Sequence, residues 1–220
     1  MSLPVYFVGG NAQCGWHCAP DGTLAAPNVG EGQVEALVFD DSAALPEDAR
    51  QLAADLVHAA AVRQAKVVIL DFERPPTQAA CSFVRQLCVQ CRTAAPSAFC
   101  AGTAAEPIAC YDAAKVLFSD FLRQLTETPH SWLELRPIDT TLCYPAQGIA
   151  PAPESAAFFS AELQCHCRLQ SRPDGYCLRL FDTPESFRNR FALLAPHLCA
   201  AIGLRTELEA ISFSVPQENL

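Results

Sequence analysis

The stretch Val67-Val-Ile-Leu-Asp-Phe-Glu73 decides the fold class. Its four apolar residues form a short run that ends in acidic residues, as expected for a buried strand that reaches a polar sheet edge. The residues from Glu47 to Gln64 precede this run with apolar side chains at helical spacing, and Thr77 is a suitable N-cap for a second helix after it. Alternation of strand and helix, with a repeat of about thirty residues, predicts βα units around a parallel sheet.

Similar short apolar runs recur along the chain on both sides of this stretch. We expect further strands at Val5–Val8, Ala36–Phe39, Ala98–Ala101, Trp132–Leu135, Thr141–Tyr144 and Cys199–Leu204. Residues 112–126 fit either a strand at Val116–Phe118 followed by a helix, or one continuous helix. The turn Arg172-Pro-Asp-Gly175 predicts a hairpin, and Thr183-Pro184 starts a helix. The pattern predicts α/β class: one domain, residues 1–220, forming a compact (β/α)8 TIM-like barrel, complete or incomplete.

Composition narrows the classes of function. The 220 residues are 50% hydrophobic and carry a net charge of -9, which excludes a disordered chain and disfavours nucleic acid as a partner. The first residues show neither a signal peptide nor a membrane span, so we expect a cytoplasmic protein without a membrane partner. The twelve cysteines are then interpreted as reduced, buried thiols. Cys14–Cys18, Cys88–Cys91 and Cys165–Cys167 lack a second pair at zinc-site spacing, so we expect neither a metal nor a cofactor.

Asp71 and Glu73 are the strongest candidates for chemistry. A strand has a period of two, so both side chains should lie on one face at the carboxyl end of the strand, where α/β folds place functional groups. Two neighbouring carboxyl groups perturb each other, and one could stay protonated at neutral pH. Such a pair suits cleavage of a glycosidic bond. The alternative is a solvated rim, or a structural ion pair between Glu73 and Arg74.

The segment Asp71-Phe-Glu-Arg-Pro-Pro76 resembles the catalytic strand of glycoside hydrolase family 18, the chitinase-like barrels, and above all the short bacterial members associated with spore cortex and germination. Phe181-Asp-Thr-Pro-Glu-Ser-Phe187 is similar to the segment before the last strand of those barrels. The resemblance implies that Glu73 is the general acid and that Asp71 orients the 2-acetamido group of the substrate. That group is then the nucleophile in a retaining hydrolysis of glycans containing N-acetylglucosamine.

The chain also departs from the family pattern. Lys66 and Ile69 occupy positions on this strand where the family has acidic or polar residues. The sequence shows no clear Tyr-Asp pair at the sixth strand, where the family places a tyrosine that holds the acetamido carbonyl. The segment Phe118-Ser-Asp120 is the nearest candidate, and Tyr144 could substitute only with a shifted strand count. These departures support a second reading, a non-catalytic barrel that binds a glycan or a protein partner.

The remaining candidates would bind substrate around the acidic pair. Trp16 follows the first strand and could stack on a sugar, with loop packing as the alternative. Asp40 and Asp41 end the second strand and could face Asp71, or they could be charges before the next helix. Arg74 and Tyr144 complete the predicted substrate-binding set. Asp182 is interpreted as a cap and turn residue.

Overall fold

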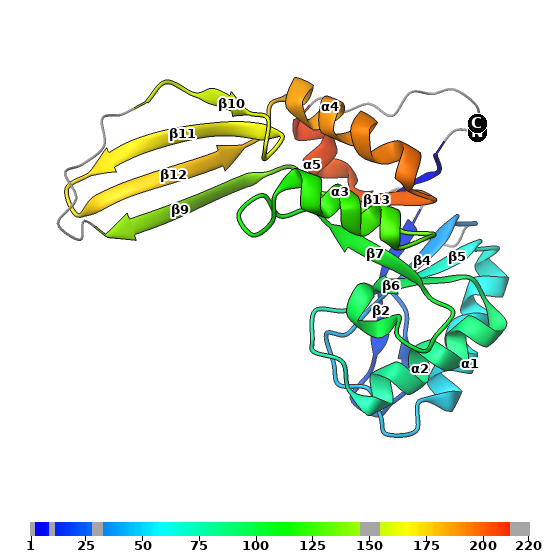
Figure 1. Cartoon of the computed structure of the whole chain (residues 1–220). Coiled ribbons are helices and arrows are strands. Elements are labelled where there is room, and N and C mark those ends of the chain that lie inside the picture. Colours follow the sequence, from blue (N-terminus) through cyan, green and yellow to red (C-terminus); the bar gives the residue numbers. More distant parts are fainter. Residues whose placement is uncertain (1–2, 9–11, 28–32, 146–154, 212–220) are drawn as a thin grey trace.

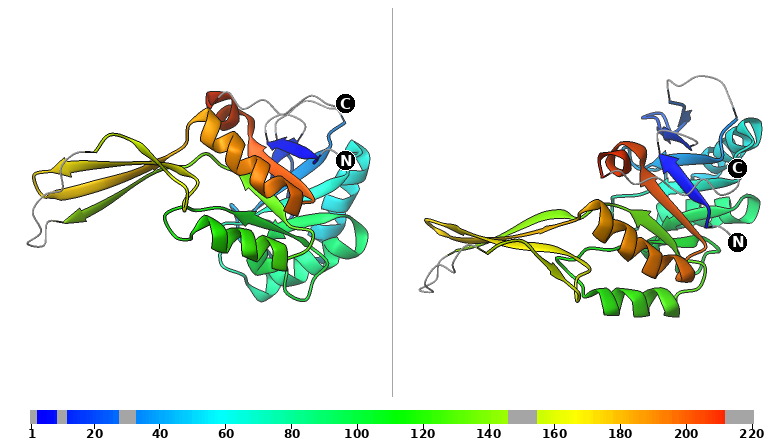
Figure 2. Two further views of the ribbon diagram at one scale, coloured as in Figure 1. Left: turned by 45° about the horizontal axis from the view of Figure 1, so that its top comes forward. Right: turned by 90° about the horizontal axis from the view of Figure 1, so that it is seen from above.

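The computed structural model describes residues 3–8, 12–27, 33–145 and 155–211. It has two parts, a body built around a curled nine-stranded sheet and a four-stranded sheet that extends away from that body (Figure 1). The helices lie on the body and leave the second sheet uncovered in all three views (Figures 1 and 2). The sequence predicted strands of this second sheet, but not that they form a separate sheet.

Eight strands of the large sheet run parallel, and one short strand pairs antiparallel at its end. The order across the sheet is β1 (Val5–Val8), β13 (Ala200–Leu204), β8 (Trp132–Leu135), β7 (Glu106–Cys110), β6 (Thr93–Pro96), β5 (Val67–Asp71), β4 (Ala36–Asp40), β2 (Ala12–Cys18) and β3 (Leu24–Ala25). An additional pairing joins β1 to β2 through Val8 and Ala12. The sheet is therefore curled, and the fold is a mixed α/β half-barrel.

Helices cover only part of the outer face. The α-helices are α1 (Arg50–Arg63), α2 (Gln78–Gln90), α3 (Phe118–Glu127), α4 (Pro184–Leu194) and α5 (Arg205–Ala210), and the 3-10 turns are η1 (Ser97–Phe99) and η2 (Ala195–His197). Within the described ranges, no α-helix follows β1, β2 or β6. The α/β class is confirmed, whereas a full (β/α)8 arrangement with a helix after every strand is not. No helix in the described part of the chain is long and apolar enough to cross a membrane.

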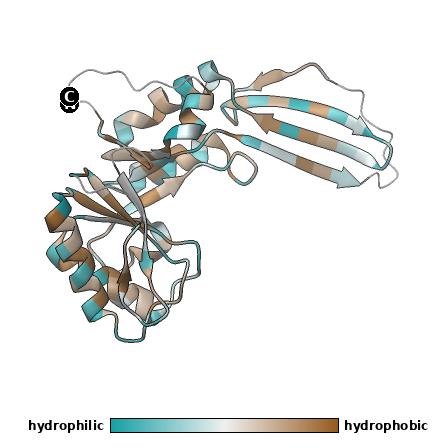
Figure 3. Ribbon diagram, turned by 180° about the vertical axis from the view of Figure 1, so that it is seen from behind, coloured by the Kyte–Doolittle hydropathy of each residue, from teal (hydrophilic) through white to brown (hydrophobic). Residues whose placement is uncertain are grey.

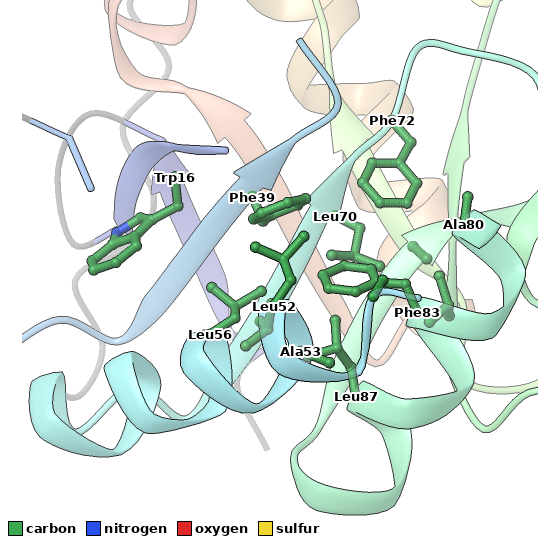
Figure 4. Packing of buried hydrophobic residues seen from close by; sticks show 14 of the residues in the cluster. Trp16, Phe39, Leu52, Ala53, Leu56, Leu70, Phe72, Ala80, Phe83 and Leu87 are labelled. Carbon is green, nitrogen blue, oxygen red and sulfur yellow. The ribbon is translucent and has the colours of Figure 1, made fainter. Parts of the chain in front are cut away.

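Residues of the central strands are buried on both faces of the sheet. On the outer face, Phe39 and Leu70 pack against Leu52 of α1 and Phe83 of α2 (Figure 4). On the inner face, a separate cluster fills the curl of the sheet, with Tyr6, Val38, Val67, Ile69, Trp132 and Ile202 among its members. This double burial explains why these strands read as continuous apolar runs, as is typical of parallel sheets.

The second sheet contains the hairpin that the turn at Arg172–Gly175 predicted. Its antiparallel order is β10 (Phe158–Ser160), β11 (Cys165–Arg172), β12 (Gly175–Phe181) and β9 (Asp139–Pro145). Hydrophilic and hydrophobic residues alternate along its strands (Figure 3). A disulfide joins Cys143 to Cys177 across β9 and β12, so the expectation of reduced thiols is wrong for this pair. Disulfides are typical of oxidising compartments, and the cytoplasmic location remains a prediction.

Two expected elements are placed differently. The run Ala98–Ala101 is not a strand, because β6 ends at Pro96 and the 3-10 turn η1 buries Phe99 in the outer core. Neither alternative for residues 112–126 is correct. The strand there is β7, which ends earlier, and α3 begins only at Phe118. Between them, Asp112 accepts a hydrogen bond from the Ala114 N–H at 3.0 Å, which stabilises a turn.

Asp182 has a larger role than capping. Its carboxylate forms two hydrogen bonds of 2.6 Å with the Arg190 guanidinium, and the two side chains are 0% and 5% exposed. It also accepts a hydrogen bond from the Ile138 N–H at 2.7 Å, just before β9. The α4 cap is Thr183, which forms a capping box with Ser186. Asp182 therefore connects the base of the four-stranded sheet to α4 through a buried ion pair.

Candidate active site

The candidate site lies at the carboxyl edge of the curled sheet. Val67 and Ile69 of β5 belong to the inner cluster, so strand alternation directs Asp71 to the same inner side. Asp40 is the register partner of Asp71 on β4, and Ala36 and Val38 before it also face inward. Asp40 therefore lies beside Asp71 across neighbouring strand ends, and its role in substrate binding stays a prediction.

Two further side chains reach this edge from the other half of the sheet. Cys110 on β7 and Glu134 on β8 are register partners, two residues beyond the inward-facing Ile108 and Trp132. Both therefore face the same inner side as Asp71. Neither residue was predicted from the sequence. Glu134 was detectable as the polar residue within the strand Trp132-Leu-Glu-Leu135, but its proximity to Asp71 was not.

The carboxylates of this edge act on one another. Partial removal from solvent raises the pKa of Asp71, and the negative charges of Glu134, Glu73, Asp40 and Asp41 raise it further. Cys110 responds in the same way, because partial desolvation and the nearby Glu134 carboxylate raise the pKa of its thiol to about 12. Asp71 thus holds a proton more readily than an isolated aspartic acid.

Glu73 lies on the loop after β5, and Asp41 holds the backbone of that loop. The Asp41 carboxylate accepts hydrogen bonds from the N–H groups of Glu73 at 3.0 Å and Arg74 at 2.9 Å. The Arg74 guanidinium donates to the Ser42 carbonyl at 2.7 Å, so the two strand-end loops are joined twice. Asp41 is therefore not a helix-terminal charge, since α1 begins only at Arg50.

Phe72 sets the orientation of the residues on either side of it. Its ring is buried on the outer face of the sheet, 4.9 Å from the Phe99 ring and 6.2 Å from the Phe39 ring, measured between centroids (Figure 4). Alternation along the extended chain then sends Asp71 and Glu73 toward the opposite side. Both acidic residues are exposed. Among the described residues, no ion pair or hydrogen bond engages the Glu73 carboxylate, so the alternative of a Glu73–Arg74 ion pair is wrong.

Trp16 is not placed to stack on a sugar. It lies within β2 rather than in a loop, and only 7% of its surface is exposed. Its ring belongs to the outer core cluster, between the sheet and α1 (Figure 4). The alternative interpretation, that Trp16 packs against other residues and does not bind a sugar, is therefore correct. Its buried indole ring stabilises the fold.

Tyr144 is also far from the predicted site. It lies near the end of β9 in the second sheet, where its ring stacks on Tyr176 with centroids 5.1 Å apart. That end of β9 points away from the body and from β5 (Figure 1). The prediction that Tyr144 substitutes for a sixth-strand tyrosine is therefore wrong. The candidate segment Phe118-Ser-Asp120 is also wrong, because those residues begin helix α3.

A Tyr-Asp pair does follow the sixth parallel strand in chain order, namely Tyr111-Asp112 directly after β7. The sequence analysis overlooked it because the strand was not placed there. However, Tyr111 is buried against Phe118 and Phe121, and its hydroxyl donates to the Leu163 carbonyl at 2.8 Å. The Tyr111 hydroxyl is therefore already hydrogen-bonded on the outer side of the sheet. The side chain that faces the inner side at the end of β7 is that of Cys110.

The cysteine groups do not form a metal centre in the part of the chain that the structure describes, where no cluster of three His, Cys, Asp or Glu side chains has a suitable arrangement. The side chain of Cys14 lies outside the described residues. Cys165 and Cys167 are buried, and desolvation raises the pKa of both thiols. Their environment is that of small apolar core residues.

Comparison with solved structures identifies the fold. The spore cortex-lytic enzymes SleL of Bacillus megaterium QM B1551 and Bacillus cereus match with TM-scores of 0.55 and 0.56, at 14% and 13% identity, over 92% and 88% of this chain. The chain spans 66% and 63% of those two proteins. A chitinase of Chromobacterium violaceum ATCC 12472 matches with a TM-score of 0.57 and 11% identity, over 99% of this chain and 100% of its own. No protein-family model and no curated protein sequence matches. The chain therefore shares the fold of these proteins, a chitinase-like fold.

Proposed function

We propose that this protein is a glycoside hydrolase that acts on glycans containing N-acetylglucosamine by retaining, substrate-assisted hydrolysis. The observation that carries the proposal is the placement of Asp71 and Glu73. Asp71 faces the inner side of the sheet among other carboxylates, and Glu73 extends a free carboxylate from the loop just beyond it. The similarity in fold to SleL and to a chitinase supports the same class of reaction.

In this mechanism, Glu73 and Asp71 have separate tasks. Glu73 donates its proton to the glycosidic oxygen, the bond from that oxygen to the anomeric carbon breaks, and the acetamido carbonyl oxygen of the substrate forms the new bond. Asp71 accepts a hydrogen bond from the acetamido N–H and steadies the positive charge that develops there. Glu73 then removes a proton from the water that opens the cyclic intermediate, which restores the acid.

The surrounding residues would position this pair. Asp41 fixes the backbone at Glu73, and Arg74 fixes the loop through Ser42. Asp40 and Glu134 add negative charge next to Asp71, which raises the pKa of the Asp71 carboxyl. In this arrangement Asp40, Asp41 and Arg74 serve the loop and its charge, whereas Trp16 and Tyr144 take no part.

Replacement of Glu73 by Gln tests the proposal, because the amide has the same shape but cannot donate or accept the required proton. We expect hydrolysis of N-acetylglucosamine oligomers to fall by at least about a hundredfold, with an unchanged circular dichroism spectrum. Glu162→Gln is a matched control, since Glu162 is an exposed carboxylate on the loop before β11. Unchanged turnover in Glu73→Gln would overturn the assignment.

A second candidate function is non-catalytic binding of a glycan or a protein partner. It is favoured by the occupied Tyr111 hydroxyl and by Ile69, which is buried where the family pattern has a polar residue, while Lys66 pairs with Glu35 at 3.4 Å. Calorimetric titration with the same oligomers distinguishes the two. Binding of intact oligomer, without product after long incubation and with equal affinity in Glu73→Gln, supports the second function and excludes the first.

A further inference from the structure

The four-stranded sheet has a long open edge at β9 in the part of the chain that the structure describes. In the described residues, β9 pairs with β12 on one side, and no strand or helix lies along its other side in three views (Figures 1 and 2). The opposite edge strand, β10, has only three residues, whereas β9 has seven. Short edge strands, charged side chains, prolines and bulges are common protections against edge pairing. β9 is long and without a bulge, and its one charge and its proline, Asp139 and Pro145, lie only at its two ends.

The register shows which backbone groups of β9 are free. The Cα atoms of Cys143 and Cys177, which lie opposite each other, are 4.2 Å apart, the spacing of a pair that exchanges no backbone hydrogen bonds. At the base of the strand, Ile138 accepts a hydrogen bond from the Asp182 N–H at 2.9 Å. Both observations direct even-numbered residues toward β12. The N–H and C=O groups of Thr141 and Cys143 therefore point outward at the open edge.

We propose that β9 is a dimerisation edge, which pairs antiparallel with β9 of a second copy about a two-fold axis at Leu142. In this register Thr141 and the partner subunit's Cys143 exchange both backbone hydrogen bonds, and symmetry repeats the pair. The Asp139 N–H reaches the carbonyl of the partner subunit's Pro145. Pro145 is tolerated at this end because only its carbonyl is required.

The side chains of β9 are self-complementary in the same register. Leu142 lies opposite its own copy in a close, non-hydrogen-bonded pair, on the face that also carries the stacked pair Tyr144 and Tyr176. Thr140 lies opposite the partner subunit's Tyr144, which is 42% exposed in the single chain. Asp139 meets a proline rather than a like charge, and Arg179 already balances its charge at 3.0 Å. These contacts favour a second copy over an unrelated partner, since no charge opposes a like charge.

Sedimentation equilibrium over a range of protein concentrations tests the dimer. We expect a mass that rises toward twice the 23.8 kDa of one chain as concentration increases. Thr141→Pro removes an outward N–H and should shift dissociation to at least about tenfold higher concentration, whereas Thr141→Val keeps the N–H and should dimerise like the wild type. A mass of one chain at all concentrations, or an equal dimer in Thr141→Pro, would overturn the proposal.

Cysteine cross-linking keeps the test valid if Thr141→Pro fails to fold. In the proposed register, Leu142→Cys places two thiols directly opposite each other, within disulfide distance. Thr140→Cys is the matched control, because its copy lies several residues away along the paired strands. After oxidation with diamide, we expect mass spectrometry to detect two peptides joined by a disulfide at position 142 in the Leu142→Cys variant only. Absence of that peptide, or equal cross-linking through position 140, would contradict the register.

Discussion

Asp41 holds the backbone of Glu73, although the two residues belong to different strand-end loops. One carboxylate oxygen of Asp41 accepts a hydrogen bond from the Glu73 N–H at 3.0 Å, and the other accepts one from the Arg74 N–H at 2.9 Å. The exposed carboxylate of Glu73 thus extends from a backbone that is tied to the neighbouring strand. The position of a general acid relative to its substrate depends on such support.

Replacement of Asp41 by Ala should release that loop. We expect the turnover number for N-acetylglucosamine oligomers to fall about tenfold, because Glu73 is then less well positioned, and the free energy of unfolding to fall by about 1 kcal/mol. Urea denaturation and steady-state kinetics measure the two effects. Asp41→Asn keeps one acceptor and should show a smaller loss. Full activity in Asp41→Ala would show that the two hydrogen bonds do not position Glu73.

Asp71 should make the protein less stable as pH rises. Its pKa is raised in the folded state, so the native protein binds the proton more tightly than the unfolded chain does, and stability falls as pH rises above the ordinary value of 3.8. Asp71→Asn removes this charge. We expect the variant to be more stable than the wild type at pH 7, with the difference shrinking as pH falls toward 3.8 and lost below it. Urea denaturation from pH 3 to 7 measures it, and a difference independent of pH would contradict the prediction.

The buried ion pair between Asp182 and Arg190 should be costly to break. Asp182→Ala leaves the Arg190 guanidinium buried and unpaired, so we expect a loss of about 3–5 kcal/mol in the free energy of unfolding. Arg188→Ala, on the exposed side of α4, is the matched control and should cost under about 0.5 kcal/mol. Thermal or urea unfolding compares the variants. Similar stability in both would show that this pair does not anchor the four-stranded sheet.

Tyr111 should matter for stability and not for hydrolysis. Tyr111→Phe removes the hydrogen bond from its hydroxyl to the Leu163 carbonyl, so we expect a loss of about 1 kcal/mol with unchanged kcat and KM. Kinetics on N-acetylglucosamine oligomers, together with urea denaturation, separate the two effects. A large fall in kcat at unchanged stability would instead place the hydroxyl at the substrate.

Local patterns were sufficient to predict several features correctly. The turn Arg172–Gly175 indicated its hairpin, and the Thr183-Pro184 pair indicated the start of α4. The strand at Val67 also ends in Asp71 as predicted, whereas Glu73 lies on the loop beyond it. In each case the residues that determine the conformation are neighbours in the chain, so backbone preference and alternation of side chains are enough.

The sequence by itself determined the α/β class and the place of Asp71 at a strand end with Glu73 just beyond it, because these depend on residues close together in the chain. Only the tertiary structure decided which distant residues meet them. Glu134 raises the pKa of Asp71 from another strand, Asp41 holds Glu73 from a neighbouring loop, and Trp16 is buried under a helix. These relationships depend on strand order and on the curl of the sheet, which arise from packing over the whole chain and from no single segment.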